Sequence, residues 1–364
     1  MPMTPALSES TSFTDGRSPA GLRLQIVADT GPTMPLWEPL LHDLERLAAE
    51  TGAFDAIEVS HLSPDGTLGH RQQADAVTLV LSDCVGPQWR PGPAGVRWFQ
   101  TLHDWAGRRL VAVVQPLPER MWRQTAFQGK PGTILTPAGG SPNALLRFTP
   151  YETPTWHDQD ESEGFLIPIL EASPTWLAHW LRLVEGPGGA AAPASVGRVA
   201  PLPVLYDGPR ARPADLSAED LVLRFRATAS PQAFRLAGHL AVGIAQLPVM
   251  CLVQDAVEPQ AQRSHLAEVI LSGMLRALPD SPGSYAFREG VCELLLSSLP
   301  NSLFRRTVAA LTHAAADAVP GPEAAPAEGR GLAQAAAARL KGTEVFDPAF
   351  VFLSTASLKR LQAA

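Results

Sequence analysis

The chain contains few cysteines and no long apolar run, and both absences narrow the classes of protein to which it can belong. No run of apolar residues approaches the roughly 20 that a transmembrane helix needs, so we do not expect a membrane-spanning protein. The three cysteines, Cys84, Cys251 and Cys292, are far apart and odd in number. Their spacing implies neither a disulfide framework nor a metal site, which favours a reducing cytoplasm.

The N-terminal residues and the charge balance exclude two further classes. Residues 1–20 lack a basic start followed by an apolar core, so we do not expect a signal peptide. They are rich in serine, threonine and proline, and we predict that they are disordered. The net charge is −7, with 29 basic against 36 acidic residues. General nucleic-acid binding needs a basic surface, and this balance argues against it.

Common catalytic motifs are also missing. The sequence has no phosphate-binding G-x-x-x-x-G-K-[ST], no dinucleotide fingerprint and no G-x-S-x-G elbow. His265 and Glu268 have the spacing of only half a zinc signature, and we interpret them as residues at the start of a helix. None of these classes of enzyme is therefore indicated.

Two short apolar runs that end in aspartate are the most informative feature that is present. Residues 22–28 lead into Asp29, and residues 76–81 lead into Ser82 and Asp83. Both runs are typical of strands buried in a parallel sheet, whose carboxyl ends face the ligand crevice. Carboxylates with hydroxyls beside them, such as Thr33, can hold a hard cation through oxygen ligands. The pattern predicts a binding site at this edge of the sheet.

Strand and helix patterns alternate as far as about residue 184, which predicts a doubly wound α/β domain over 21–185. Further strands are expected at 56–62, 110–114 and 165–170, and further helices at 36–47, 98–105 and 174–184. Pro116–Gly164 is predicted to be a proline-rich, irregular loop. Its charge run is interpreted as solvated, and consists of Asp158, Asp160, Glu161 and Glu163.

A second, mainly α-helical domain is expected over 215–364, after a Gly/Ala/Pro-rich linker at 186–214. Helices are predicted to open at Ser217, at Ser230-Pro231 and at Ser264, with a brief strand at 285–287. This order is compatible with a winged-helix-like domain. The neutral-to-acidic balance favours docking to a protein rather than to DNA.

The two strand ends resemble a known family. Asp29-Thr30-Gly31-Pro32-Thr33 is similar to the Asp-x-Ser-x-Ser motif of von Willebrand factor A-type (vWA) domains, and Leu81–Cys84 is similar to their second aspartate motif. In that family a partner carboxylate completes the shell of an incompletely coordinated metal ion. The resemblance implies a Rossmann-type vWA-like domain and a site for Mg²⁺ or Mn²⁺ formed by Asp29, Thr33 and Asp83.

Further motifs look like those of a divergent actinobacterial group of vWA-like proteins with a C-terminal helical domain. They are Trp37–Leu40, Gly52–Phe54, Ser82–Pro87, Gln115–Arg123, Arg224–Ser230 and Ser264–Val269. Members of the group are associated with MoxR-type AAA ATPases, proteases or NB-ARC/TPR proteins in conflict or signalling systems. The resemblance covers most of residues 21–361 and implies a partner of one of these kinds.

The metal motif departs from the family in one position. Gly31 stands where a hydroxyl ligand is needed, and Thr67 is only a candidate for the remaining ligand position. Alternatively, Asp29 caps a helix and Asp83 shapes a turn, both of which suit short acceptor side chains. We expect a degenerate metal site that binds Mg²⁺ or Mn²⁺ weakly or not at all.

Two functional hypotheses follow. The first is a non-catalytic cytoplasmic adaptor that binds a protein or peptide through Asp29, Thr30, Thr33 and Asp83, together with two residues of the proline-rich segment, Trp122 and Arg123. The alternative is an enzyme, or a subunit of one, in peptide or natural-product modification.

The residues behind that alternative have simpler interpretations. An enzyme would use the region around Asp29, Asp83 and Cys84, but a small buried thiol is the commoner state of such a cysteine. Five tryptophans are interpreted as packing of the core or its rim, with an aromatic cleft for a peptide as the alternative. They are Trp37, Trp89, Trp98, Trp105 and Trp122.

Overall fold

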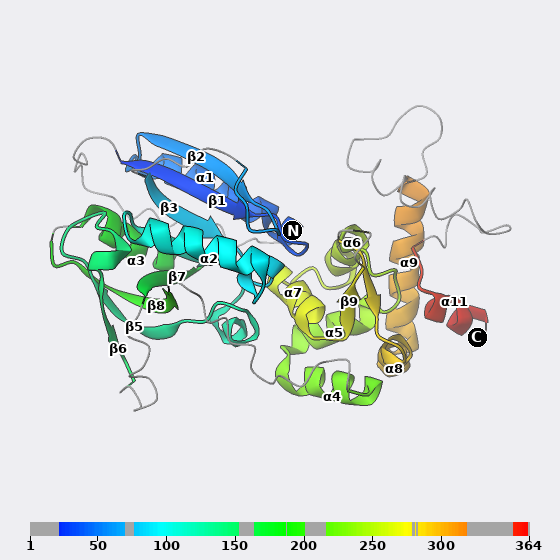
Figure 1. Cartoon of the computed structure of the whole chain (residues 1–364). Coiled ribbons are helices and arrows are strands. Elements are labelled where there is room, and N and C mark those ends of the chain that lie inside the picture. Colours follow the sequence, from blue (N-terminus) through cyan, green and yellow to red (C-terminus); the bar gives the residue numbers. More distant parts are fainter. Residues whose placement is uncertain are drawn as a thin grey trace. The chain divides into compact units, whose positions relative to one another are not determined.

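The computed structural model describes residues 22–69, 76–152, 164–186, 188–200, 216–278, 281, 283–318 and 352–362. The chain divides into two compact units, and the boundary falls between Pro209 and Arg210. Figure 1 labels their elements. The predictions for residues 1–20 and for the charge run at 158–163 lie outside the described residues.

The first unit is an α/β unit with a mainly parallel central sheet, as predicted. Its eight strands have the order β2-β1-β3-β4-β7-β8-β5-β6. The parallel strands are β1 (Arg23–Asp29), β2 (Ala56–Leu62), β3 (Ala76–Leu81), β4 (Val111–Gln115) and β7 (Phe165–Glu171). The chain passes from β1 to β2 on one side, and then to β3 on the other side of β1. This reversal makes the crevice between β1 and β3 the topological switch point of a Rossmann-type sheet.

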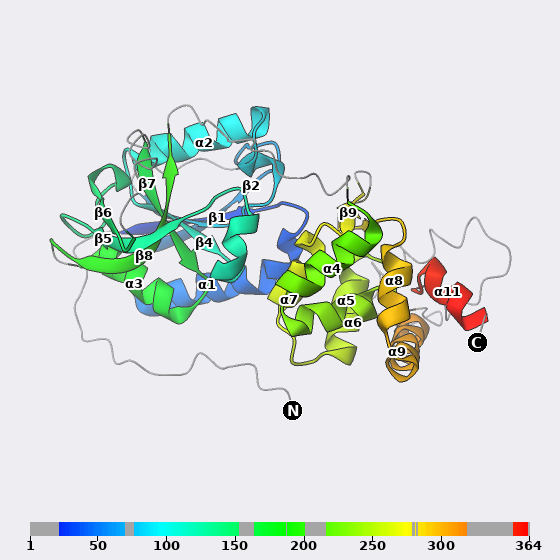
Figure 2. The ribbon, with the colours of Figure 1, turned by 90° about the horizontal axis from the view of Figure 1, so that it is seen from below.

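Helices cover both faces of this sheet. Figure 2 shows α2 (Pro93–Ala106) on one face, and α1 (Glu38–Thr51) and α3 (Pro174–Glu185) on the other. Every residue of β3 and β4 is buried, as a strand between two helical layers requires. The continuous apolar runs in the sequence are therefore explained by burial on both sides.

An antiparallel extension of the sheet corrects two predictions. Pro116–Gly164 is not irregular throughout, because it contains β5 (Lys130–Leu135) and β6 (Arg147–Pro150). The proposed linker at 186–214 contains β8 (Ala191–Val199), which pairs antiparallel with both β7 and β5. The rest of that linker, from residue 201 on, lies outside the described residues.

Close packing explains why β5 and β8 contain the glycines that are typical of linkers. A Cβ atom at Gly197 of β8 would lie 2.4 Å from the Phe127 ring, and one at Gly132 of β5 would lie 2.4 Å from the Thr149 carbonyl oxygen. Glycine is needed at both positions because the neighbouring groups lie so close. Small residues here allow close packing and do not indicate flexibility.

Short 3-10 helices follow several strands at the carboxyl edge. η1 (Met34–Trp37) follows β1, η2 (Pro87–Trp89) follows β3, and η3 (Glu119–Gln124) follows β4. The five tryptophans between residues 37 and 122 are at most 8% exposed, which confirms that they pack in the core. Trp89 and Trp105 both contact Trp98 edge-on, with ring centroids 5.7 and 5.8 Å apart. An aromatic cleft formed by these rings is excluded.

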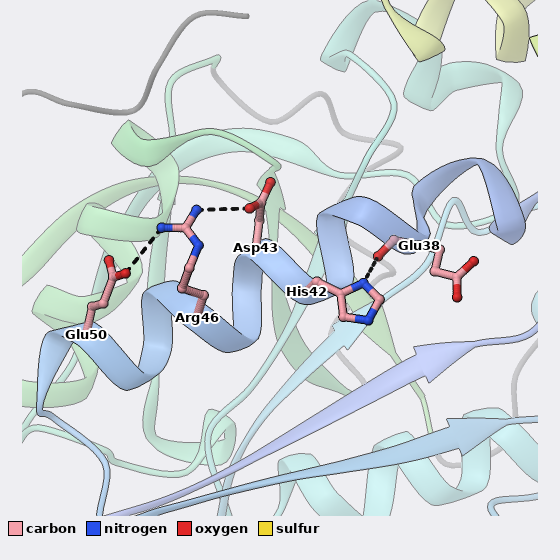
Figure 3. A network of polar contacts seen from close by, with 5 residues as sticks. All are labelled: Glu38, His42, Asp43, Arg46 and Glu50. Atoms are coloured by element: carbon pink, nitrogen blue, oxygen red, sulfur yellow. Dashed lines mark hydrogen bonds and ion pairs between the residues drawn. The ribbon is translucent and has the colours of Figure 1, made fainter. Parts of the chain in front are cut away.

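The outer face of α1 is a solvated, charged surface. Arg46 reaches Asp43 at 2.9 Å and Glu50 at 3.2 Å, and His42 Nδ1 lies 3.0 Å from the carbonyl oxygen of Glu38 (Figure 3). Solvent screens such pairs, and they contribute little to stability. Their main effect is to keep this face of the helix polar.

The second unit is mainly helical. Its helices are α4 (Ala218–Thr228), α5 (Pro231–Leu240), α6 (Leu247–Val257), α7 (Arg263–Leu271), α8 (Val291–Ser298), α9 (Asn301–Ala318) and α11 (Thr355–Gln362). β9 (Leu275–Ala277) and β10 (Tyr285–Phe287) form a two-stranded antiparallel sheet. The mainly helical character was predicted, and the winged-helix assignment stays a prediction.

Side-chain caps explain where several of these helices begin. Ser217 Oγ accepts a hydrogen bond from the Asp220 amide at 3.1 Å, and Ser230 Oγ accepts one from the Ala233 amide at 3.2 Å. Both starts were predicted. α7 begins at Arg263 rather than at Ser264, because Gln262 provides its cap. α6 was not predicted.

No helix within the described residues combines the length and the apolar character that crossing a membrane requires.

A buried asparagine joins β4 to β7 and provides a test of the fold. Asn143 is 1% exposed and bonds both the amide and the carbonyl oxygen of Val111, at 2.6 and 2.9 Å, and the carbonyl oxygen of Leu166 at 2.6 Å. Asn143→Ala leaves these groups unsatisfied and should lower the free energy of unfolding by about 3 kcal/mol.

Urea unfolding followed by tryptophan fluorescence measures this loss, because all eight tryptophans lie between residues 37 and 180. Leu145→Ala is the control, since Leu145 lies in the same short helix η4 (Asn143–Leu145) and is 55% exposed. Equal stability of the two variants would contradict the role given to Asn143.

Candidate functional site

The two strand-end aspartates lie together at the switch point. Asp29 is the last residue of β1, and Asp83 follows β3 by two residues. β1 and β3 are parallel neighbours, with Ala28 opposite Leu81. The prediction that both aspartates end adjacent strands at the same edge is confirmed.

The Asp29 carboxylate accepts four hydrogen bonds. Oδ1 accepts from the Gly31 amide at 2.8 Å and from Gln88 Nε2 at 2.5 Å. Oδ2 accepts from Ser82 Oγ at 2.5 Å and from Trp89 Nε1 at 3.1 Å. Asp29 is 4% exposed. Its lone pairs are thus used within the protein, and the side chains of η2 fill the crevice in which ligands of such sheets commonly bind.

Asp83 connects the loops that follow β1, β3 and β4. It is 2% exposed, and its Oδ2 accepts a hydrogen bond from Thr33 Oγ1 in the first loop. Its Oδ1 accepts from the Val85 amide at 3.1 Å, and its carbonyl oxygen accepts from Gln115 Nε2, at the end of β4, at 3.1 Å. These bonds join the loops after β1 and β3 to each other and to the end of β4, where the third loop begins.

Burial perturbs both carboxyl groups. Burial raises the pKa of Asp29, against the hydrogen bonds from Ser82, Gly31, Trp89 and Gln88 that lower it. Burial also raises the pKa of Asp83 to about 6. The Asp29 charge adds to that rise, whereas Thr33, the Val85 amide and Arg90 oppose it.

The residues present do not fit a magnesium or manganese ion. Mg²⁺ demands near-octahedral oxygen coordination, and here Asp29 accepts four protein donors while Thr33 donates to Asp83. Gly31 has no hydroxyl, and Thr67 bonds Asp65 at 2.7 Å on an exposed turn. Within the described parts of the chain, no group of three or more His, Cys, Asp or Glu side chains could hold a metal.

Turn formation accounts for both aspartates instead. The Asp29 and Asp83 carboxylates each accept from the backbone amide two residues ahead, at Gly31 and Val85. These contacts are Asx turns, which short acceptor side chains favour at strand ends. The turn proposed for Asp83 is thus present. Asp29 forms a turn rather than a helix cap, because the residue that precedes η1 is Thr33.

Cys84 is not placed to act as a nucleophile. It is fully buried, and burial together with the charges of Asp83 and Asp29 raises the pKa of its thiol well above the usual value. A buried thiol of raised pKa is inert. Its backbone has a positive φ of 56°, and its carbonyl oxygen accepts from the Ala126 amide at 3.0 Å. The residue shapes the loop after β3.

The predicted partner-binding residues separate into a buried and an exposed group. Asp29, Thr33 and Asp83 are each at most 6% exposed, whereas Thr30 and Arg123 are exposed. The buried residues can support a binding surface but offer a partner little side-chain area.

Trp122 belongs to the buried group, so the prediction that its side chain contacts a partner is wrong. It is 3% exposed, its Nε1 donates to the Leu117 carbonyl oxygen at 2.7 Å, and its ring lies 6.5 Å from that of Trp176 in α3. Trp122 pins η3 onto the core because both its ring and its N–H are engaged inside the unit.

Three residues that bond the two aspartates were not assigned to this cluster from the sequence: Gln88, Trp89 and Gln115. Gly86-Pro87 was the available signal, because proline favours the first position of a short helix and brings the next residues back toward the strand end. The amide group of Gln88 packs against Gly86, where a Cβ atom would lie 2.4 Å from Gln88 Oε1 and would displace that side chain. Among the described residues, that Oε1 is a buried acceptor without a hydrogen-bond partner.

His265 lies in the first turn of α7, as predicted, whereas Glu268 lies further along α7 and caps the start of α5 instead. His265 Nδ1 accepts from the Gln262 amide at 2.8 Å. Glu268 accepts from the Ser230 amide at 2.8 Å and from Ser230 Oγ at 3.2 Å. Both side chains stabilise helix starts.

Comparison with known proteins identified no family model, no curated protein and no solved structure that matches this chain.

Metal binding is tested directly by calorimetry with MgCl₂ and MnCl₂. Because the Asp29 oxygens are already engaged, we expect weak binding or none. Gly31→Ser should strengthen any weak binding, because the serine supplies the missing hydroxyl ligand. Its Cβ atom would lie 3.3 Å from Asp29 Oδ1, which places the hydroxyl beside that carboxylate. Tight binding to the natural chain that is lost in Asp29→Ala would contradict this expectation.

The raised pKa of Asp83 predicts a pH dependence of stability. The folded pKa of about 6 lies above the ordinary value of 3.8, so the folded state binds more protons between these pH values. The stability contributed by protonated Asp83 is complete below about pH 4 and is lost as pH rises through about 6, by up to about 3 kcal/mol. Asp83→Asn should remove this part of the slope.

Urea unfolding of the α/β unit between pH 4 and pH 7, followed by tryptophan fluorescence, measures the effect. Asp43→Asn on the exposed face of α1 is the matched control and should keep the natural slope. If Asp83→Asn and Asp43→Asn show the same slope, the raised pKa of Asp83 is wrong.

Proposed function

We propose that this protein is a non-catalytic, cytoplasmic adaptor or regulatory protein that binds a protein or peptide at the carboxyl edge of a vWA-like domain. The family resemblance supports a conflict, signalling or biosynthetic system. It also supports a second component, such as an AAA ATPase, a protease or an NB-ARC/TPR protein, that couples to a winged-helix-like helical unit. One observation carries the mode of binding, namely the four hydrogen bonds that the buried Asp29 carboxylate accepts.

Those hydrogen bonds favour a metal-independent binding surface. In a vWA site with a metal, the strand-end carboxylate is turned toward the ion and the partner. Here Asp29 and Asp83 turn inward and fix the loops after β1, β3 and β4. A surface that is already ordered loses less conformational entropy on binding, which increases affinity.

The exposed residues of the fixed loops form the contact surface in this proposal. Thr30 lies in the first loop, Pro87 and Arg90 in the second, and Arg123 in η3 of the third; all are exposed. Arginine is enriched among residues that dominate binding energy. Arg123 takes over the role first proposed for the pair of Trp122 and Arg123.

Charge reversal at the two ends of β4 tests the proposal. Arg123 follows β4 at its carboxyl end, and Arg108 precedes it at its amino end; both are exposed. Tagged full-length chains carrying Arg123→Glu or Arg108→Glu are incubated in a lysate of the source cells, and retained proteins are quantified by mass spectrometry. Proteins retained by the natural chain should fall about 10-fold with Arg123→Glu and persist with Arg108→Glu, because loss of a central contact costs about 1.4 kcal/mol or more.

Two outcomes would contradict the proposal. Equal retention by the two variants would place the partner away from the carboxyl edge. Loss of the partner from the natural chain in EDTA would show that binding needs a metal. Melting of each variant on the same preparation separates loss of binding from loss of fold.

A further inference from the structure

The C-terminal segment Phe352–Gln362, here called the tail, is bound to the helical unit like a peptide ligand. Residues 319–351, which connect it to α9, lie outside the described residues. The tail still contributes to the core of the unit, because Phe352 and Leu353 are only 2% and 5% exposed. Its hydrogen bonds to the rest of the unit are made near its two ends, by Phe352 and Ser354 and by Arg360.

The first end is extended and pairs with the turn between α5 and α6. The Ile244 amide donates to the Phe352 carbonyl oxygen at 2.8 Å, and the Ser354 amide donates to the Val242 carbonyl oxygen at 2.9 Å. Gly243 and Leu353 form an antiparallel bridge. Main-chain pairing of this kind is a common way to bind a peptide.

Ser354 lies at the junction between the extended end and α11. Its Oγ donates to the Ala241 carbonyl oxygen at 2.8 Å and accepts from the Ser357 amide at 3.2 Å. It therefore fixes the tail to the turn and also caps α11. Cys292 of α8 lies beside this point, with its Sγ 3.9 Å from Ser354 Oγ.

Arg360 holds the second end. Its guanidinium donates to the carbonyl oxygens of Leu296 and Leu299, at the end of α8, and to Asn301 Oδ1, at the start of α9. It also lies 4.4 Å from the centre of the Phe304 ring. A single side chain thus satisfies helix-end carbonyls and makes a cation–π contact.

Between these two ends, the tail fills its site incompletely. A cleft of about 290 Å³ remains open between α8 and α11. It is lined by Glu293, Leu296, Ser297, Ala356, Lys359 and Arg360. The short side chain of Ala356 leaves room that a larger apolar residue would occupy.

We propose that the turn 241–245, α8 and the start of α9 form a peptide-binding groove for a partner protein, and that the tail occupies this groove as an internal competitor. The partner peptide has two extended apolar residues, a serine-capped helix, an arginine equivalent to Arg360 and a larger apolar residue in place of Ala356. This peptide fills the open cleft, whereas the tail has the advantage of being tethered. Because the tail is part of the same chain, its effective concentration at the groove is at most roughly 1 mM, which a better-fitting peptide can overcome.

The test uses full-length chains and two fluorescent peptides that cover residues 351–364, one natural and one with Ala356→Leu. In the chain, Arg360→Ala weakens the internal competitor, and Arg276→Ala on the exposed side of β9 is the control that removes an arginine away from the groove. Fluorescence anisotropy should show both peptides binding to the Arg360→Ala chain at least 10-fold more tightly than to the Arg276→Ala chain. The Ala356→Leu peptide should bind about 10-fold more tightly than the natural one, as burial of its extra apolar atoms predicts. Absence of peptide binding to a folded Arg360→Ala chain, or no gain from Ala356→Leu, overturns the proposal.

Hydrogen exchange of the natural chain keeps the test decisive if Arg360→Ala does not fold. Release of the tail exposes the amides of Ile244 and Ser354 without unfolding α5. Peptic fragments that contain them should therefore exchange at least 10-fold faster than fragments from 231–240. Exchange of both regions at one common rate would show that the tail opens only with the whole unit, and overturns the proposal.

Discussion

The Asp29 carboxylate is the constraint on which the carboxyl edge of the sheet depends. A buried carboxylate is costly unless its oxygens are satisfied, and four donors from the loops after β1 and β3 satisfy this one. Each donor in turn fixes its own segment. The position of η2, and of the Trp89 ring that packs on Trp98, follows from this one acceptor. The edge that could bind a ligand is thus ordered from within.

This edge of the sheet differs from a metal-binding edge in the direction of its side chains and not in the order of its strands. The strand order and the position of the two aspartates fit a ligand crevice at the switch point. The difference lies in the direction of the acceptors, which face Ser82, Gln88 and Trp89 instead of solvent. The strand order alone therefore does not identify a ligand for this edge of the sheet. Function has to be argued from the side chains.

The sequence allowed the parallel sheet and several helix starts to be predicted, because each has a local physical cause. Buried strands such as β3 need continuous apolar runs, and serine caps at Ser217 and Ser230 mark helix starts. β5 and β8 could not be predicted from local sequence. Their glycines are explained by close contacts with residues distant in sequence, and the two strands pair with each other. Asp29 and Asp83 could be predicted because each follows an apolar run that marks a strand end. Gln88 and Gln115 could not, because only the folded loops bring them to the two aspartates.

The position of β8 has a consequence for dividing this protein into parts. β8 pairs with β7 on one side and β5 on the other, so it joins the parallel sheet to the β5–β6 hairpin. A fragment that ends near residue 185, where the alternation of strands and helices stops, loses this strand. Two strands would then have unpaired edges, and open edges promote aggregation. The shortest α/β fragment worth producing must include Val199.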